Sequence, residues 1–193
     1  MRLAISNIAW DVSEDKEVAG LLQRYSVDAV DIAPGKYFPD PGKAEDAEII
    51  RVRRWWENKG IEITGMQALL FGTSGLNLFG SPEVQAKMLA HLDAVCRIAS
   101  GLAATRLVFG SPKNRDRSGL ADAEANAVAI DFLNQFGSFF TSDHKVASIT
   151  RRVRFQANQY AMDACSISKV AEKIDCYCIR FRIRKTGTVT ILG

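Results

Sequence analysis

Residues 61–67 read IEITGMQ, an apolar segment that ends in a polar side chain. Segments of the same kind occupy residues 3–8, 28–32 and 105–109, and each is followed by a turn rich in Gly, Pro, Asn or Lys and then by an amphipathic stretch. Parallel strands need a crossover helix between them. The repeated unit therefore predicts an α/β fold built on a parallel sheet.

The pattern predicts a series of alternating elements in one domain, 1–193, because no stretch has the composition of a linker. Ser13 is expected to cap the first helix, and residues 33–36 are expected to form a loop that continues neither helix nor strand. The expected strands are 2–8, 27–32, 61–70, 105–109, pieces of a fifth at 146–149 and 152–157, and a sixth at Cys178–Ile183, with a short β-prone terminus at Thr188–Leu192. The expected helices are 13–25, 44–58, 82–100, 121–140 and 166–174.

Length and composition exclude several classes of protein. A chain of 193 residues can bury a core as one large domain. No stretch has the length of a membrane span, and the N-terminus lacks a signal-peptide pattern. The cysteines are few and irregularly spaced, which indicates a reducing cytoplasm. A zinc site at Cys176, Cys178 and Cys165 is less favoured than idle thiols, because structural zinc sites pair two such elements.

The net charge of +3 conceals a break along the chain. From Thr141 onward there are ten Lys/Arg against four Asp/Glu, whereas the preceding residues carry 15 against 18. A basic tail can indicate nucleic-acid binding. The cations lie within apparent strands, however, as at 152–154 and 180–184. Strands with one solvated face, or a degenerate tail, explain the charge more simply.

Chemistry in parallel sheets collects at the carboxyl ends of the strands. Each candidate there has a structural alternative. Asn7 contacts a sugar or caps a turn; Asp31 is functional or pairs with Lys36; Gln67 meets a substrate hydroxyl or a core partner. Lys113, Asn114 and Arg115 hold a phosphate or form a solvated loop. His91 lies on a helix far from the strand ends and is expected at the surface or in packing, and His144 has no assignment.

Three stretches carry a family resemblance: DIAPGK at 31–36, GMQALLFG at 65–72 and LVFGSPKNR at 107–115. In this order they resemble the sugar isomerase/epimerase group of xylose isomerase-like TIM barrels, a superfamily that includes endonuclease IV. The resemblance covers residues 1 to about 137 and resumes at Phe155–Asn158 and 168–193. It implies an incomplete (β/α)8 TIM barrel, α/β in class, with about five βα units and a sixth strand. Residues 1–140 are family-like, and 141–193 form a divergent basic tail.

The resemblance also implies a divalent metal, Mn²⁺ or Mg²⁺, held by carboxylates while a proton moves between neighbouring carbons. The sequence departs from that pattern. Gln156 stands where the family has a Glu, and Lys185, beside Arg184, stands where it has an Asp. Strands seven and eight would lie beyond Gly193. We therefore expect no metal ligand, no catalytic residue and no cofactor in this chain, and place Gln156 and Asn158 among the substrate contacts.

These observations favour a sugar or sugar-phosphate isomerase/epimerase-like protein, with a small-molecule partner and no membrane or nucleic acid. The alternative is a non-catalytic sugar-phosphate-binding or scaffold barrel fragment. A complete barrel takes about 250 residues and has no free sheet edge. The open side of an incomplete barrel thus implies that the chain forms a homo-oligomer, rearranges, or is the product of a truncated or frame-damaged gene. The last is favoured, because the change in charge along the chain coincides with the loss of the carboxylates that would bind the metal.

Overall fold

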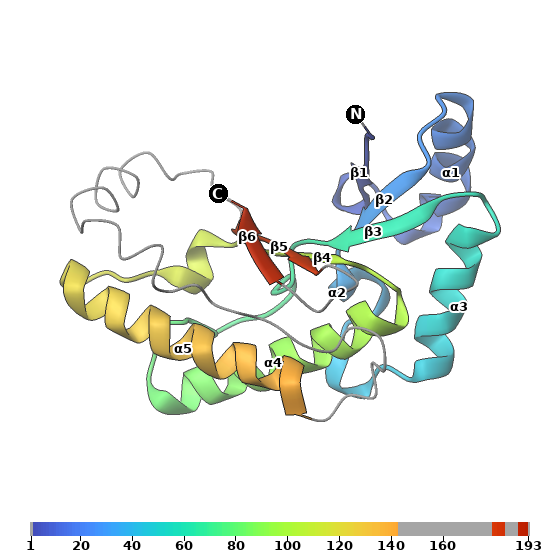
Figure 1. Cartoon of the computed structure of the whole chain (residues 1–193). Helices are drawn as coiled ribbons and strands as arrows, with labels where there is room; N and C mark the ends of the chain where they lie inside the picture. Colours follow the sequence, from blue (N-terminus) through green and yellow to red (C-terminus); the bar gives the residue numbers. More distant parts are fainter. Residues whose placement is uncertain (1, 143–178, 184–188, 193) are drawn as a thin grey trace. The chain divides into compact units, whose positions relative to one another are not determined.

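The computed structural model describes residues 2–142, 179–183 and 189–192 (Figure 1). The chain divides into two compact units, one comprising Met1–Gly72 and Ala94–Phe109, the other Thr73–Asp93 and Gly110–Gly193. Helix α4, Pro82–Gly101, begins in the second unit and ends in the first. Among the residues that the structure describes, no helix has the length and apolar character needed to cross a bilayer.

A parallel sheet forms the centre of the first unit. Its strands are β1 (Ile5–Ser6), β2 (Ala29–Ile32), β3 (Glu62–Met66) and β4 (Arg106–Phe109), paired in that order (Figure 1). Three pairs set the register: Ser6 with Asp31, Ile32 with Met66, and Met66 with Leu107. The β2–β3 register shifts between Val30 and Asp31. The expected parallel α/β arrangement is confirmed for these strands.

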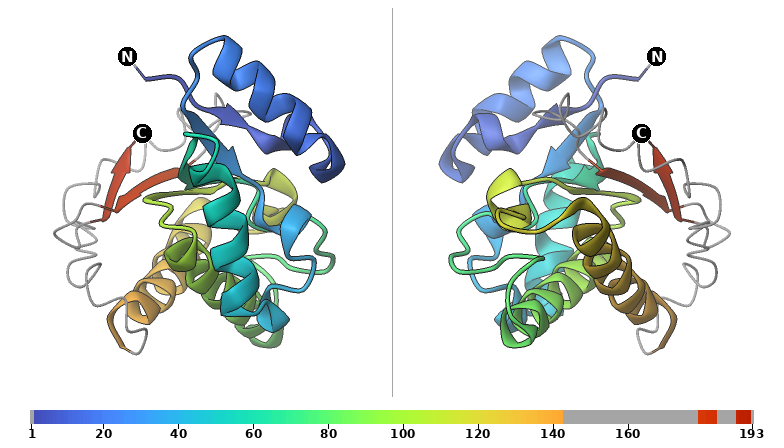
Figure 2. Two further views of the ribbon diagram at one scale, coloured as in Figure 1. Left: turned by 90° about the vertical axis from the view of Figure 1, so that its right-hand side faces the viewer. Right: turned by 90° about the vertical axis from the view of Figure 1, so that its left-hand side faces the viewer.

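One face of this sheet carries the core of the first unit. Val30, Ile32, Met66, Leu107 and Phe109 are all buried, and they alternate along their strands as side chains of one face do. Helix α3, Asp46–Glu57, and the end of α4 run side by side along this face (Figure 2). Burying one such side chain contributes about 1.5–3 kcal/mol.

Helix α3 and the end of α4 approach each other so closely that one position requires glycine. A Cβ added to Gly101 would lie 2.5 Å from Cγ2 of Ile49, which is itself buried. The apolar residues that define this face were visible in the sequence. The tight crossing that needs Gly101 was not.

The structure places three expected elements differently. Ser13 does not cap helix α1 (Asp15–Arg24); instead Asp11 and Glu14 form a capping box around the short turn η2, Val12–Glu14. Residues 34–37 are not a loop but a helical turn, α2 (Pro34–Tyr37), because proline at the first position suits helix entry. Strand β1 is shorter than expected, since the Ser6 hydroxyl accepts from Ile8 N and starts the turn η1, Asn7–Ala9.

Strand β3 ends at Met66 rather than Leu70, and the following backbone turns at Ala68, whose φ is 53°. The other first-unit element is the turn η3, Pro41–Lys43. Helix α3 and strand β4 lie within two residues of their expected bounds.

The second unit contains the first part of α4, the turn η4 (Pro112–Arg115) and α5 (Asp122–Ser142). Its buried apolar residues include Leu92 and Phe132. Strands β5 (Ile179–Ile183) and β6 (Val189–Leu192) pair antiparallel, with Phe181 opposite Ile191. The expected sixth strand and β-prone terminus are therefore present, but their pairing differs from that of an all-parallel sheet, because only a short segment joins them and antiparallel strands need no crossover helix. The expected elements at 146–149, 152–157 and 166–174 lie outside the described residues.

Candidate functional site

The carboxyl ends of β1, β2 and β3 bring the expected polar residues Asn7, Lys36 and Gln67 to one edge of the sheet. Because Ser6 pairs with Asp31 and Ile32 with Met66, the residues that follow these strands share this edge. The backbone N–H of Gln67 donates to the Ile32 carbonyl at 3.0 Å and extends the ladder by one bond. We call Asn7, Lys36 and Gln67 the edge cluster.

Asn7 joins the ends of the first two strands. Its side chain is 1% exposed, and Oδ1 accepts a 2.6 Å hydrogen bond from the backbone N–H of Ala33. Its Nδ2 is buried without a hydrogen-bond partner within the described ranges. The turn after β1 is capped by Ser6 rather than by Asn7. The Asn7 side chain thus links two strands at the edge.

Lys36 is enclosed by backbone carbonyl groups. Its Nζ donates to Asn7 O at 3.0 Å, to Ile8 O at 3.4 Å and to Trp10 O. An ammonium group has three donors, so these carbonyls occupy all of them. Lys36 therefore holds residues 7–10 in place, and a substrate would have to displace a carbonyl to reach the ammonium.

Of the two alternatives for Asp31, a functional role or pairing with Lys36, the pairing does not occur. Asp31 Oδ1 accepts from Thr64 Oγ1 at 2.9 Å and lies 3.9 Å from the Arg106 guanidinium. These side chains lie on the sheet face opposite the one that α3 and α4 cover, where Asp31 keeps 30% of its side chain exposed. A Cβ on Gly65 would lie 2.9 Å from Asp31 Oδ1, so glycine admits the carboxylate here. The register shift in β2 and β3, which no sequence pattern marks, creates this group.

Gln67 is half-buried and contacts β1. Its Nε2 donates to Ser6 Oγ at 2.6 Å, and the same hydroxyl accepts from Ile8 N at 3.2 Å. Of the two alternatives for Gln67, an internal partner is thus present. The amide oxygen is an additional acceptor, and Ala68 beside it has a left-handed backbone, a conformation that concentrates at functional sites.

A second polar group in the first unit was missed at the sequence level. Asp15, buried at 7% exposure, accepts from Trp10 Nε1 at 2.7 Å and from Tyr37 OH at 2.5 Å, and Trp56 Nε1 donates to the Tyr37 oxygen at 3.2 Å. Burial, with the Asp15 carboxylate second, raises the pKa of Tyr37 far above its usual range. An apolar cavity of about 330 Å³ adjoins Asp15, Tyr37 and Trp56. The capping box at Asp11–Glu14, which sets Asp15 at the start of α1, was a signal that could have located this group.

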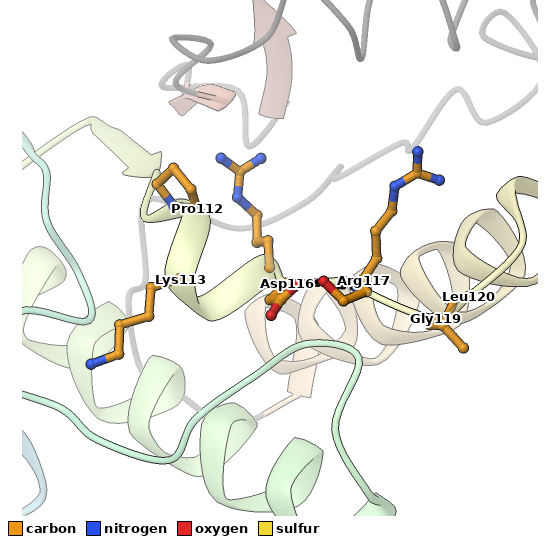
Figure 3. A pocket seen from close by; sticks show the side chains of 8 residues that line it. Pro112, Lys113, Asp116, Arg117, Gly119 and Leu120 are labelled. Carbon is orange, nitrogen blue, oxygen red and sulfur yellow. Dashed lines mark hydrogen bonds between the residues drawn. The ribbon is translucent and has the colours of Figure 1, made fainter.

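The second unit presents a polar loop after β4. Asn114 is buried, accepts from Ser111 Oγ and donates from Nδ2 to Leu76 O at 2.8 Å. Its neighbours differ from it: Lys113 is exposed and Arg115 is half-buried. An open pocket of about 590 Å³ lies along this loop (Figure 3). The expected trio therefore consists of one anchoring amide and two available cations.

The remaining expected residues separate into two groups. His91 lies on α4, as expected. Gln156, Asn158, His144, Lys185 and the cysteines at 165, 176 and 178 lie outside the described residues. Within the described ranges, no three His, Cys, Asp or Glu side chains gather closely enough to hold a metal ion.

Comparisons with known proteins identify the fold. No protein-family model matches the chain, and no curated protein matches it. Among solved structures, D-psicose 3-epimerase in the presence of D-fructose superposes with a TM-score of 0.54 at 19% identity, covering 72% of this chain and 48% of the epimerase. A provisionally assigned xylose isomerase from Rhodospirillum rubrum gives 0.54 at 18% identity, covering 72% and 50%. The chain has a xylose isomerase-like TIM-barrel fold and spans about half the length of these structures.

Proposed function

We propose that this chain binds a sugar, free or phosphorylated, at the carboxyl edge of its parallel sheet, as an isomerase/epimerase-like protein. The observation that carries the proposal is the edge cluster, in which consecutive strand ends deliver Asn7, Lys36 and Gln67 to one edge. Substrates of α/β barrels bind at this edge. The likeness to an epimerase and an isomerase supports the same class of substrate.

The residues at this edge are suited to hydroxyl groups. The Gln67 amide oxygen can accept a hydrogen bond, and so can the Asp31 carboxylate, which lies on the adjoining sheet face, is 30% exposed and is held by Thr64 at 2.9 Å. Thr64 thus holds Asp31, and the Gln67 amide is held by Ser6 Oγ at 2.6 Å, so both acceptors are positioned before a ligand arrives. Preorganised polar groups of this kind set orientation and specificity in small-molecule sites.

A second function, binding without catalysis, is favoured by one observation. Proton transfer in this class is assisted by a metal on carboxylate ligands, and the sequence has Gln156 and Lys185 where the family that it resembles has a Glu and an Asp. The residues at the edge bind and orient a sugar in either case. The two functions differ in whether epimerisation or isomerisation follows binding.

Calorimetric titration of the full chain with D-fructose and D-psicose tests the proposal. We expect binding that survives a chelator, and we expect Gln67→Leu to weaken it about fivefold to tenfold, the equivalent of one lost hydrogen bond. Gln23→Leu is the matched control, because Gln23 is an exposed residue of α1 whose side chain donates to the Lys59 carbonyl at 2.7 Å. Equal weakening by both variants, or no binding by the unaltered chain, contradicts the proposal.

A parallel assay separates the two functions. The chain is incubated with each sugar in Mn²⁺ or in chelator, and the products are resolved by chromatography. Turnover in Mn²⁺ alone establishes a metal-dependent enzyme. Binding without turnover in either condition establishes the non-catalytic alternative.

A further inference from the structure

The pocket beside η4 belongs to the second unit, and the described residues that line it form one continuous stretch of chain. Its volume is about 590 Å³, within the range of small-molecule sites. In Figure 3, the ammonium group of Lys113 and the guanidinium of Arg117 extend from this stretch in different directions. We call the lining stretch the cation loop; it comprises Pro112, Lys113, Arg115, Asp116, Arg117, Ser118, Gly119 and Leu120.

The cation loop is held rigidly by residues that do not line the pocket. Asn114 Nδ2 donates to Leu76 O at 2.8 Å, and Leu78 N donates to Asn114 O at 2.9 Å. Asn77 Nδ2 donates to the carbonyl of Asp116, also at 2.8 Å. The backbone of Ser111, just before the loop, has a φ of 72°, a conformation that costs energy for a non-glycine residue. The loop is therefore shaped before any ligand binds.

The charges of the cation loop are unequally compensated. Arg117 donates to Asp122 on α5. Asp116 accepts from Ser118 N and Oγ, at 3.0 and 2.5 Å, and these bonds, the hydroxyl first, keep the pKa of its carboxyl below the usual range. Lys113 and Arg115, by contrast, form no ion pair with any residue that the structure describes.

Arg115 provides an independent indication of a ligand. Its Nε is buried and has no hydrogen-bond partner in the described part of the chain. A buried donor without an acceptor costs about 1–3 kcal/mol, so native structures rarely leave one unpaired. Because Arg115 also lines the pocket, an oxyanion bound there would bring acceptor oxygens to its guanidinium group.

We propose that the cation loop binds a phosphate group through Arg115 and Lys113. The proposal goes beyond the proposed function, because it assigns the second unit a site of its own for inorganic phosphate or a phosphate ester. Arginine matches phosphate oxygens with its planar fork, and lysine adds a mobile point charge. Asn114 acts as a positioning residue: it lies between these two cations in sequence, and its hydrogen bonds with Leu76 and Leu78 hold the loop in place.

The test is calorimetry on the full chain at low and physiological salt, with inorganic phosphate, D-fructose 6-phosphate and D-fructose as probes. We expect both phosphate-bearing probes to bind more weakly as salt rises, because exposed charges are screened. Arg115→Gln and Lys113→Gln should each weaken phosphate binding about tenfold and leave D-fructose binding unchanged. Arg115→Lys keeps the positive charge but loses the planar guanidinium group. Its affinity for phosphate should lie between that of Arg115→Gln and that of the unaltered chain.

Lys87→Gln is the matched control, because it removes the same charge from an exposed position of the second unit, on α4. Thermal melts establish that each variant folds. Equal losses in the control and in the loop variants overturn the proposal, as does phosphate binding that no loop variant changes.

The outcomes separate the two proposals. D-fructose binding that depends on Gln67, without any phosphate binding, overturns the phosphate site and leaves the proposed function standing. Binding of inorganic phosphate that depends on Arg115, without binding of D-fructose or D-psicose, supports the site in the cation loop and overturns the proposed function.

Discussion

The edge cluster and the cation loop both follow the carboxyl ends of parallel strands, yet they use their polar groups in opposite ways. Lys36 and Asn7 direct their side chains to backbone groups of the first unit. Beside the cation loop, Asn114 donates to the backbone carbonyl of Leu76, whereas Lys113 and Arg115 in the loop have no protein carboxylate partner in the described ranges. A polar residue at a strand end therefore either fastens the fold or remains available to a ligand, and only its neighbours decide which.

The largest expected effect comes from Lys36→Met. The substitution keeps the aliphatic stem but removes the charged donor from the carbonyls of Asn7, Ile8 and Trp10. Hydrogen bonds from charged groups contribute about 1.5–3 kcal/mol, so we expect the free energy of unfolding to fall by about 3 kcal/mol in urea denaturation. Lys43→Met is the control, because Lys43 is exposed and pairs with Asp40 at the surface, and it should leave the denaturation midpoint unchanged. Coincident curves for both variants would contradict a structural role for Lys36.

A smaller loss of stability is expected from Asn7→Ala. The Ala33 N–H, buried beneath Asn7, would lose its acceptor at 2.6 Å. An unsatisfied buried donor costs about 1–3 kcal/mol, and we expect a loss of about 2 kcal/mol by the same denaturation measurement. Asn58→Ala, at an exposed position that follows α3, serves for comparison. If neither variant changes the free energy of unfolding, the hydrogen bond between Asn7 and Ala33 does not stabilise the fold.

Gly65→Ala tests the close approach beside Asp31. The new Cβ would lie 2.9 Å from Asp31 Oδ1 and 3.0 Å from Arg106 O, so the sheet or the carboxylate must shift. Overpacking of this kind costs about 1–3 kcal/mol, and we expect a value near the lower end because Asp31 is partly exposed. Gly20→Ala on α1, where nothing lies within 4 Å, should instead stabilise by about 0.5–1 kcal/mol. If both variants raise the melting temperature, the Cβ at residue 65 is accommodated without overpacking.

The smallest expected effect is in the cation loop. Asp116→Asn removes a negative charge from the pocket lining but keeps an oxygen that can accept from Ser118 N. We expect phosphate affinity to rise about threefold at low salt and the gain to shrink at physiological salt. Glu124→Gln, an exposed change of equal charge on α5, is the comparison for calorimetry. A gain of equal size in Glu124→Gln would mean that overall charge, and not the loop, controls binding.

Residue types and periodicity were sufficient for much of the fold. The apolar segments at 28–32 and 105–109 became strands β2 and β4, and the stretch at 82–100 became α4, with bounds close to those expected. Periodicity did not locate the starts of elements as well. Asp11 rather than Ser13 caps the turn before α1, because which of several neighbouring acceptors takes a backbone N–H depends on the local backbone path.

The partners of the candidate residues were less predictable than their positions. Asp31 pairs with Thr64 and Arg106 rather than with the nearby Lys36, because a register shift turns two distant segments toward it. Gln67 lies 61 positions from its partner Ser6, and the buried group of Asp15, Tyr37 and Trp56 joins three separate segments. Such pairings follow from strand order and helix packing, which short-range patterns do not contain.

By itself, the sequence determined that alternating strands and helices build a parallel sheet and that polar residues collect at its carboxyl ends, because strand and helix periods are local properties of the chain. Only the tertiary structure decided which of those residues are enclosed. Burial and hydrogen-bond partners arise when segments far apart in the chain come together. For this reason, two residues of the same type differ in role: Lys36 donates to the carbonyls of a backbone turn, whereas Lys113 lines an open pocket.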